Sequence, residues 1–476
     1  MSKLILIYSD GTGQRGGLSP DQKLSNIYKL YRATRPGPAS PISPFEQVAF
    51  YDPGLGKGEV GGWTFKRVRQ GLEAMIGTGI DTNIADCYAK IISFYEPGDQ
   101  ICIFGFSRGA YTVRALASLM NLCGVPRTLP DGSPVPKHGD VLREIAEEAV
   151  HQVYNHGAGR KRSQAPYFRQ REELGRRFRD KYGSHQNDNP AAVRGNVEPY
   201  FIGVFDTVAA LGSAKLKTVF AIAVALLLLP FALAFFMNIA WWLLVLFAIL
   251  VGSVLYWLSN FLRRTRKVFH PLGDGADNVH SDLSKRSTHW AFWKNANYDR
   301  YLPAQVKYAR HAVAIDEERA DFPRVAWGSP RTAKRKESQK PRWLKQVWFA
   351  GCHSDIGGSY SEDEARLSDI ALNWMVDELK DCVPDIQIQD ELLVTHGDPK
   401  GLQHRQIFMP VPIVKIPWKT NPRVVAAEGE LHPSVIERFE AGPVPLMGAV
   451  QDYRPEQLRN HPQVAAYYTE SDKADH

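Results

Sequence analysis

Residues Gly105 to Gly109 read Gly-Phe-Ser-Arg-Gly, which places Ser107 at the centre of a G-x-S-x-G motif. The motif follows an apolar segment, residues 100–106, that is typical of a buried strand, and it leads into residues 107–122, whose apolar positions recur at helical spacing. Small residues are needed on both sides of the serine because the turn from strand to helix leaves no room for larger side chains. We therefore expect Ser107 to be a nucleophile raised above a sheet; the alternative is an ordinary turn of small residues.

A serine hydroxyl is a weak nucleophile at neutral pH and needs a base that is itself oriented by an acid. His353 directly follows an expected strand, residues 346–350, and comes late in the chain, as the order Ser, Asp, His of α/β-hydrolases requires. Asp206 follows another expected strand, residues 200–205, and is our candidate for the acid. Two alternatives stay open at this point: His353 could cap a loop turn, and Asp355 could be the acid instead of a turn cap.

The oxyanion that forms during acyl transfer needs backbone N–H donors. Arg108, the residue after the nucleophile, is expected to supply one N–H, and the loop at Gly11 and Thr12 is expected to supply another, because glycine lets a backbone turn its N–H groups toward a site. Asp10 either braces this loop or is a simple turn residue. Cys352 is interpreted as a packed core thiol. Such chemistry needs no metal and no organic cofactor.

The composition of the chain excludes several classes of protein. It has 476 residues, of which 44% are hydrophobic and 23% charged, so it can form a large core and is too apolar for wholesale disorder. Five widely spaced cysteines show neither a C-x-x-C pair nor zinc-ligand spacing, which indicates free thiols in a reducing compartment. The net charge of +7 is spread over several basic clusters and forms no recognisable reading module, so we expect no nucleic-acid partner.

Apolar segments that end in polar or glycine-rich loops alternate along the chain with segments of helical spacing. This alternation predicts an α/β fold, a mostly parallel, α/β-hydrolase-like sheet with helices on both faces. Functional loops of such sheets lie at the carboxyl ends of the strands. The expected core strands are residues 3–8, 48–51, 100–106, 200–205 and 346–350.

The segment from Thr218 to Leu262 contains 45 residues without a single Asp, Glu, Lys, Arg or His. It is long enough for two membrane-spanning helices, residues 218–237 and 239–262, which would be joined at Asn238 and bracketed by basic residues. The sequence therefore predicts that a transmembrane hairpin interrupts the hydrolase fold. A buried hairpin of a large core and a hairpin that enters one leaflet are the alternatives.

These features divide the chain into five parts. The hydrolase domain is expected in three pieces: residues 1–129 with the nucleophile, residues 200–214 with the acid, and residues 268–476 with the histidine. A polar, basic, helical insertion of unknown role occupies residues 130–199, and the hairpin with its flanks occupies residues 215–267.

Six blocks of the sequence occur in a fixed order. They are SDGT at 9–12, QVAFYDPGLG at 47–56, YEPGDQICIFGFSRGAYTVRALA at 95–117, GVFDTVA at 203–209, YARHAVAIDE at 308–317 and VWFAGCHSDIGGSY at 347–360. Together they resemble the α/β-hydrolase domain of the type VI secretion phospholipase effector-like family. The resemblance implies a Ser-Asp-His lipid esterase, with the nucleophile at Ser107, the base at His353 and the acid at Asp206. The expected hairpin and the insertion at residues 130–195 depart from the family pattern.

We therefore predict a membrane-anchored serine hydrolase that cleaves carboxylic esters of lipids and is phospholipase-like. Its partners would be the lipid bilayer and a lipid substrate, and it would lie in the bacterial inner membrane with both soluble parts in the cytoplasm. One alternative is an esterase, thioesterase or acyltransferase that acts on another substrate. The other is a non-enzymatic membrane scaffold that retains the hydrolase fold.

Overall fold

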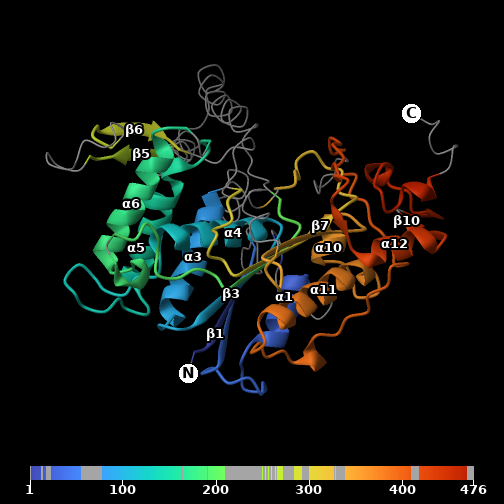
Figure 1. Cartoon of the computed structure of the whole chain (residues 1–476), viewed down its shortest axis with the longest axis horizontal. Helices are drawn as coiled ribbons and strands as arrows, with labels where there is room; N and C mark the ends of the chain where they lie inside the picture. The colour runs from blue at the N-terminus through green and yellow to red at the C-terminus, as the bar shows by residue number, and fades with distance from the viewer. Residues whose placement is uncertain are drawn as a thin grey trace, which may run out of the picture.

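A central parallel sheet organises the computed structural model of the chain (Figure 1). The structure describes residues 2–11, 14, 16–17, 23–54, 78–161, 164–189, 191–208, 266–271, 283–291, 300–325, 327, 338–408, 417–446 and 448–468, with isolated positions between 249 and 265. Seven strands form this sheet in the order β2-β1-β3-β4-β7-β8-β9, and each pairs with its neighbours in parallel. In chain order they are β1 (Leu4–Ser9), β2 (Gln47–Asp52), β3 (Gln100–Phe106), β4 (Phe201–Phe205), β7 (Tyr308–Ala314), β8 (Leu344–Phe349) and β9 (Glu430–Leu431).

Strand β1 shows why the sheet is covered on both faces. Its sequence, LILIYS, is buried along its whole length, as expected for a parallel strand between two helical layers. Because side chains alternate along a strand, Ile5 and Ile7 enter one hydrophobic core, whereas Leu6 and Tyr8 enter the other. The predicted α/β fold, with a mostly parallel sheet between helices, is therefore confirmed.

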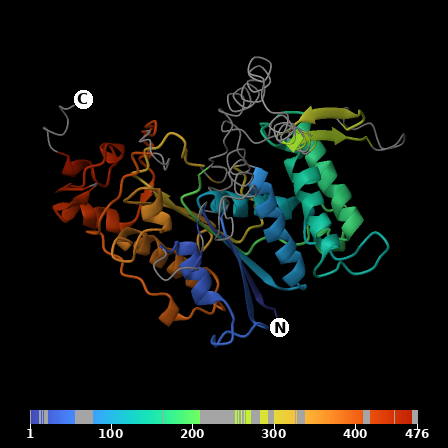
Figure 2. The same cartoon turned by 180° about the vertical axis from the view of Figure 1, so that it is seen from behind.

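The helices lie on both sides of the sheet, as Figure 2 shows from behind. One core contains residues of α3 (Thr78–Phe94), α4 (Arg108–Cys123), α5 (Asp140–Glu148) and α6 (Tyr167–Tyr182). The other contains residues of α1 (Asn26–Thr34), α10 (His353–Gly357) and α11 (Arg366–Cys382). Two small antiparallel hairpins and a further helix lie toward the two ends of the molecule (Figure 1): β5 (Arg266–Phe269) with β6 (Ser287–Trp290), β10 (Pro443–Leu446) with β11 (Ala449–Asp452), and α12 (Pro433–Glu440).

The strand order reverses direction between β1 and β3. From β1 the chain adds β2 on one side, and it then returns to add β3, β4 and the later strands on the other side. In open parallel sheets, ligand sites lie outside the carboxyl ends of the strands at such a reversal. The carboxyl ends of β1 and β3 lead to Asp10 and Ser107, so the topology brings two of the predicted loops to that edge.

The predicted location in the inner membrane is corrected by the structure. Among the residues that the structure describes, no helix combines the length and the apolar composition needed to cross a bilayer. The expected span at 218–237 and most of the span at 239–262 lie outside the described residues. The inserted transmembrane hairpin, the membrane anchor and the cytoplasmic placement of the two soluble parts therefore lack support, because an apolar run indicates burial without specifying the apolar surroundings.

The close approach of α4 to the end of β1 predicts a sharp requirement for glycine at position 109. A Cβ atom at Gly109 would lie 2.0 Å from the carbonyl oxygen of Ser9, and backbone cannot move aside as a flexible side chain can. Gly109→Ala should lower the free energy of unfolding by roughly 2–4 kcal/mol, measured by urea denaturation. Gly37→Ala is the matched control, because a Cβ there meets no atom within 4 Å; equal loss in both variants would contradict this account of the packing.

Candidate active site

Ser107 lies in the strained turn between β3 and α4. Its φ of 58° is in the left-handed region that residues with a side chain rarely adopt, and its backbone N–H donates to the carbonyl oxygen of Phe205 at 3.2 Å. A Cβ at Gly105 would lie 2.5 Å from the carbonyl oxygen of Gly109, so the turn requires the small residues that the motif supplies. The strand, turn and helix expected around Ser107 are present.

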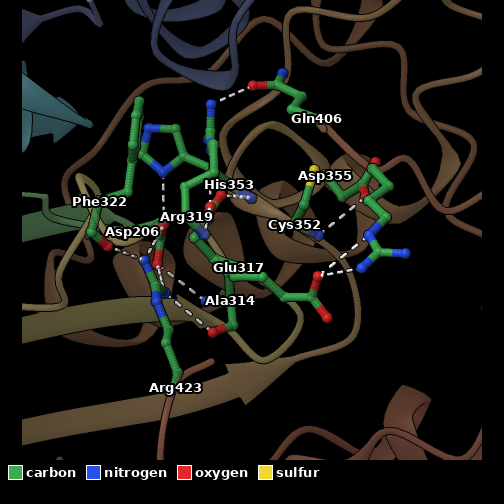
Figure 3. A network of polar contacts seen from close by, with 12 residues as sticks. Asp206, Ala314, Glu317, Arg319, Phe322, Cys352, His353, Asp355, Gln406 and Arg423 are labelled. Atoms are coloured by element: carbon green, nitrogen blue, oxygen red, sulfur yellow. Dashed lines mark hydrogen bonds and ion pairs between the residues drawn. The ribbon is translucent and has the colours of Figure 1, made fainter. Parts of the chain in front are cut away.

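His353 and Asp206 contact each other directly, although 147 positions separate them in the chain. The His353 Nδ1 atom lies 2.5 Å from Asp206 Oδ2 (Figure 3). Asp206 follows β4, and His353 begins α10 shortly after β8, so both residues lie at carboxyl ends of strands. The other ring nitrogen, Nε2, is buried and has no hydrogen-bond partner in the part of the chain that the structure describes. One nitrogen is therefore fixed by the carboxylate while the other is available.

Tight packing between α10 and β3 brings His353 to the serine turn. The rings of Phe106 and His353 lie 4.7 Å apart between centroids, and Phe106 directly precedes Ser107. A Cβ at Gly357 in α10 would lie 1.9 Å from the Phe106 ring, so only glycine permits this approach. The structure therefore gathers the three predicted residues at one edge of the sheet.

Asp206 is buried, with 1% of its surface exposed, and its charge is balanced by a residue that the sequence reading missed. Arg423 donates from Nη1 to Asp206 Oδ1 at 2.5 Å and from Nη2 to Oδ2 at 3.0 Å, while the backbone N–H of Ala314 also donates to Oδ1 at 3.0 Å. Burial alone would raise the pKa of the Asp206 carboxyl, but Arg423 and His353 outweigh burial and hold this pKa well below its usual range. Asp206 is therefore an anion at every physiological pH.

Glu317 holds the backbone of His353 and was also missed as a site residue. Its Oε2 atom accepts the His353 backbone N–H at 3.2 Å, and its carboxylate forms a two-point ion pair with Arg319 at 2.8 Å. The Arg319 guanidinium lies 3.6 Å from the centre of the Phe322 ring, and that ring packs edge-on against the His353 ring. Burial would raise the pKa of Glu317, but Arg319 outweighs it, so the pKa is lowered and the carboxylate stays charged. The acidic end of the block at 308–317 was the available signal for this residue.

Asp355, the alternative acid, contacts a different histidine. Its Oδ1 atom lies 2.7 Å from His404 Nδ1, and its Oδ2 atom accepts the backbone N–H of Cys352 at 3.0 Å at the start of α10. Cys352 is buried, and burial raises the pKa of its thiol well above the ordinary value. A small cleft beside Cys352 is lined further by Glu317 and Trp418. Asp355 therefore caps a helix, and Cys352 remains a protonated thiol.

Asp10 braces the loop after β1. Its carboxylate accepts the Gly11 backbone N–H at 2.7 Å, the Ser25 hydroxyl at 2.5 Å and the Tyr51 hydroxyl at 2.7 Å. The Cβ position of Gly11 lies 3.4 Å from the Cβ of Ser107, so the loop reaches the serine as expected. The Gly11 N–H itself is engaged by Asp10, and Thr12, the other expected donor, lies outside the described residues.

Within the described ranges, no three His, Cys, Asp or Glu side chains are placed to hold a metal ion. Asp206 and His353 form a carboxylate–imidazole pair beside the turn of Ser107. In nucleophilic acyl transfer, a carboxylate orients a histidine and the histidine accepts the serine proton.

Comparison with known proteins finds one family and a few distant relatives. The family model for "T6SS, Phospholipase effector Tle1-like, catalytic domain" matches residues 3–236 and 274–378. "Uncharacterized protein YEL023C" of Saccharomyces cerevisiae is 33% identical over 132 residues, which are 26% of this chain and 18% of the yeast protein. A crystal structure of an uncharacterized protein from Pseudomonas aeruginosa is 16% identical, with a TM-score of 0.33, over 83% of this chain and 47% of that one.

A second solved structure is titled "Structure of the Tle1 effector bound to the VgrG spike from the Type 6 secretion system". It is 16% identical, with a TM-score of 0.27, and the match covers 77% of this chain and 52% of that one. This chain therefore spans about half the length of each of these two solved proteins and about a fifth of the yeast protein.

A buried carboxylate beside Asp10 makes stability depend on pH. Asp52 ends β2, and its Oδ2 atom accepts hydrogen bonds at 2.8 Å from both Ser9 Oγ and Asn83 Nδ2. Burial raises the pKa of Asp52 to about 7, and nearby Asp10 adds to the rise. The folded protein therefore keeps the proton on Asp52 up to about pH 7, whereas an unfolded chain releases it at about pH 4. Stability contributed by the protonated group is lost as the pH rises between these two values.

Asp52→Asn should remove this loss of stability at higher pH, because the amide of asparagine is neutral at every pH and its single oxygen can accept both hydrogen bonds that Asp52 Oδ2 accepts. We expect the variant to melt several degrees above the wild type at about pH 8 and at the same temperature as the wild type at about pH 4, measured by thermal unfolding followed with circular dichroism. Asp99→Asn is the control, because Asp99 pairs with Lys3 near the other end of the sheet. This variant should not gain stability at the higher pH alone. If Asp52→Asn differed from the wild type in melting temperature by the same amount at both pH values, the assignment of this pH dependence to Asp52 would be contradicted.

Proposed function

The chain belongs to the type VI secretion Tle1-like phospholipase effector family through its catalytic domain, and on this premise we propose that it is a serine hydrolase that cleaves carboxylic esters of lipids. The family itself supports the broader assignment to lipid hydrolysis. The finer proposal assigns the nucleophile to Ser107, the base to His353 and the orienting acid to Asp206. It includes no membrane anchor.

The observation that carries the proposal is the pairing of His353 with Asp206 beside the strained serine turn. The carboxylate at 2.5 Å holds Nδ1, which leaves the buried Nε2 to accept a proton. An unsatisfied ring nitrogen alone does not mark a catalytic histidine, because four other histidines in the described part of the chain also have one buried ring nitrogen without a hydrogen-bond partner. The position of His353 favours a catalytic role, because its ring contacts Phe106 directly before the strained turn of Ser107 while Asp206 holds its Nδ1.

In the proposed reaction, Ser107 Oγ attacks the acyl carbonyl carbon while His353 Nε2 takes the hydroxyl proton. The imidazolium then gives this proton to the leaving alcohol, and an acyl-enzyme remains. Water attacks the acyl-enzyme with His353 again acting as the base, and Ser107 and the fatty acid are released. Asp206 stays ionised throughout, since Arg423 and His353 hold its pKa far below neutrality.

The oxyanion of each tetrahedral intermediate would form at the N-terminus of α4. The first N–H groups of a helix are not used by its own carbonyls and favour negative charge, which supports Arg108 as one backbone donor. The second donor is proposed to come from the loop at Gly11 and Thr12. For Gly11 to take part, its N–H must exchange the Asp10 carboxylate for the oxyanion.

Ser107→Ala should abolish labelling by a fluorophosphonate probe and lower ester hydrolysis by at least about a thousandfold, because the attacking oxygen is removed. Ser118→Ala is the matched control, since Ser118 is buried in the same helix, α4, and is not part of the proposed site. The control should keep both labelling and hydrolysis. Undiminished labelling of folded Ser107→Ala protein would contradict the assignment of the nucleophile.

A panel of substrates tests the proposed substrate class. We expect release of fatty acid from diacyl phospholipid in mixed micelles, with rates that depend on Ser107 for every substrate that is cleaved. Lysophospholipid, short-chain esters and acyl thioesters are the comparison substrates, measured at matched concentrations by kcat/KM. Hydrolysis confined to short esters or thioesters would reject the lipid substrate and favour a general esterase or a thioesterase.

A further inference from the structure

Arg423 comes from a part of the chain beyond residue 378, where the family match ends, and still reaches the proposed acid. The residue is buried, with 7% of its surface exposed. Its two terminal nitrogens contact the two oxygens of Asp206, one at 2.5 Å and the other at 3.0 Å, so that Asp206 lies between Arg423 and His353 (Figure 3). A two-point contact fixes the plane of a carboxylate, which one hydrogen bond does not do.

The guanidinium of Arg423 is itself held by two other segments. Nη1 donates to the carbonyl oxygen of Ala314, the last residue of β7, at 3.0 Å. Nη2 donates to the carbonyl oxygen of Phe322 at 3.4 Å. Because these acceptors belong to the backbone, the position of Arg423 does not depend on Asp206 alone, and the arginine can set the direction in which Asp206 Oδ2 points.

We propose that Arg423 is a positioning residue for catalysis: it fixes the Asp206 carboxylate that orients His353, and its positive charge limits how readily the Asp206–His353 pair binds a proton. This inference rests on the proposed function. The charge matters because an imidazolium cannot act as the base toward Ser107. A cation bonded to Asp206 disfavours a second positive charge on His353, so the base stays neutral to a lower pH.

Other charged and titratable groups surround the Asp206–His353 pair. Within the described part of the chain, none of the groups named below takes the place of Arg423 as the cation bonded to Asp206. The groups are Glu317, Arg319 and Arg324 from the segment after β7, His311 from β7 and Cys352 before α10. Glu317 and Arg319 neutralise each other in a direct ion pair. Burial holds the pKa of His311 well below its usual value and that of Cys352 well above, so both are uncharged. Arg324 stacks on the Trp348 ring, 4.7 Å from its centre.

A purely structural role is the alternative that the experiment must separate. Loss of one partner of a buried ion pair destabilises a protein whether or not the pair serves catalysis. Stability and total activity are therefore insufficient measures. The pH dependence of kcat, expressed per active site titrated with a fluorophosphonate, does not respond to the fraction of protein that has unfolded, so it reports on the proposed role.

The experiment compares the wild type with Arg423→Met and Arg423→Lys, using a fluorogenic ester. Arg423→Met removes both the charge and the two-point contact. We expect its kcat per titrated site to fall roughly a hundredfold, because a misplaced base loses its alignment. We also expect the acid limb of its pH–rate profile to move to higher pH by about one unit or more, because the uncompensated Asp206 carboxylate favours proton binding by the pair. Arg423→Lys keeps the charge, so its acid limb should stay in place while kcat is still reduced.

Arg310→Met is the matched control. Arg310 is a fully buried arginine on β7, and its Nε donates to Glu378 at 2.5 Å, away from the proposed site. The Arg310→Met variant should lose stability, but the acid limb of its pH–rate profile should not shift. A wild-type kcat and acid limb in Arg423→Met, or an equal shift in Arg310→Met, would overturn the inference.

If Arg423→Met does not fold, Arg423→Lys decides the matter, since wild-type kcat in that variant would equally overturn the positioning role. A wild-type protein that neither reacts with the probe nor cleaves the ester would instead refute the proposed function, so the two failures are distinguishable.

Discussion

The buried negative charge of Asp206 is the constraint on which the rest of the site depends. A carboxylate without contact with water is costly unless cations and hydrogen-bond donors surround it. Here the donors are Arg423, the imidazole of His353 and the backbone N–H of Ala314, which come from three separate segments. Correct burial of one charge therefore requires the central sheet, α10 and the C-terminal part of the chain to be assembled together.

The sheet contributes a second constraint, which is space. Ser107 adopts a positive φ, and Gly105 and Gly109 line a turn in which a Cβ would collide with backbone. The strain of such a turn persists only where surrounding packing enforces it. The contact between Gly357 and the Phe106 ring supplies part of that packing and also positions the helix that begins with His353. The same close contacts thus stabilise the fold and bring the proposed base to the turn that carries the proposed nucleophile.

Sequence patterns that involve only neighbouring residues predicted the fold well, because a single local geometry, such as a buried strand, accounts for each of them. Buried runs such as β1 and β4, followed by polar loops, identified strands of a parallel sheet, and their carboxyl ends indicated the edge at which the proposed site lies. The apolar segment from Thr218 to Leu262 shows the limit of such reasoning. Its composition meets the length rule for a membrane span, yet the inferred inner-membrane location was wrong, because no helix among the described residues is long and apolar enough to cross a bilayer; most of the segment itself lies outside those residues.

The sequence by itself determined the serine turn, since small residues at fixed spacing are a local steric requirement, and it narrowed the partners of Ser107 to residues at strand ends. Only the tertiary structure decided that Asp206 contacts His353 whereas Asp355 contacts His404. It also revealed Arg423, which lies 217 positions from Asp206 and belongs to no recognisable motif. The physical reason is that local sterics act within a few residues, whereas the partner of a buried charge depends on strand order and on how distant segments cross the sheet.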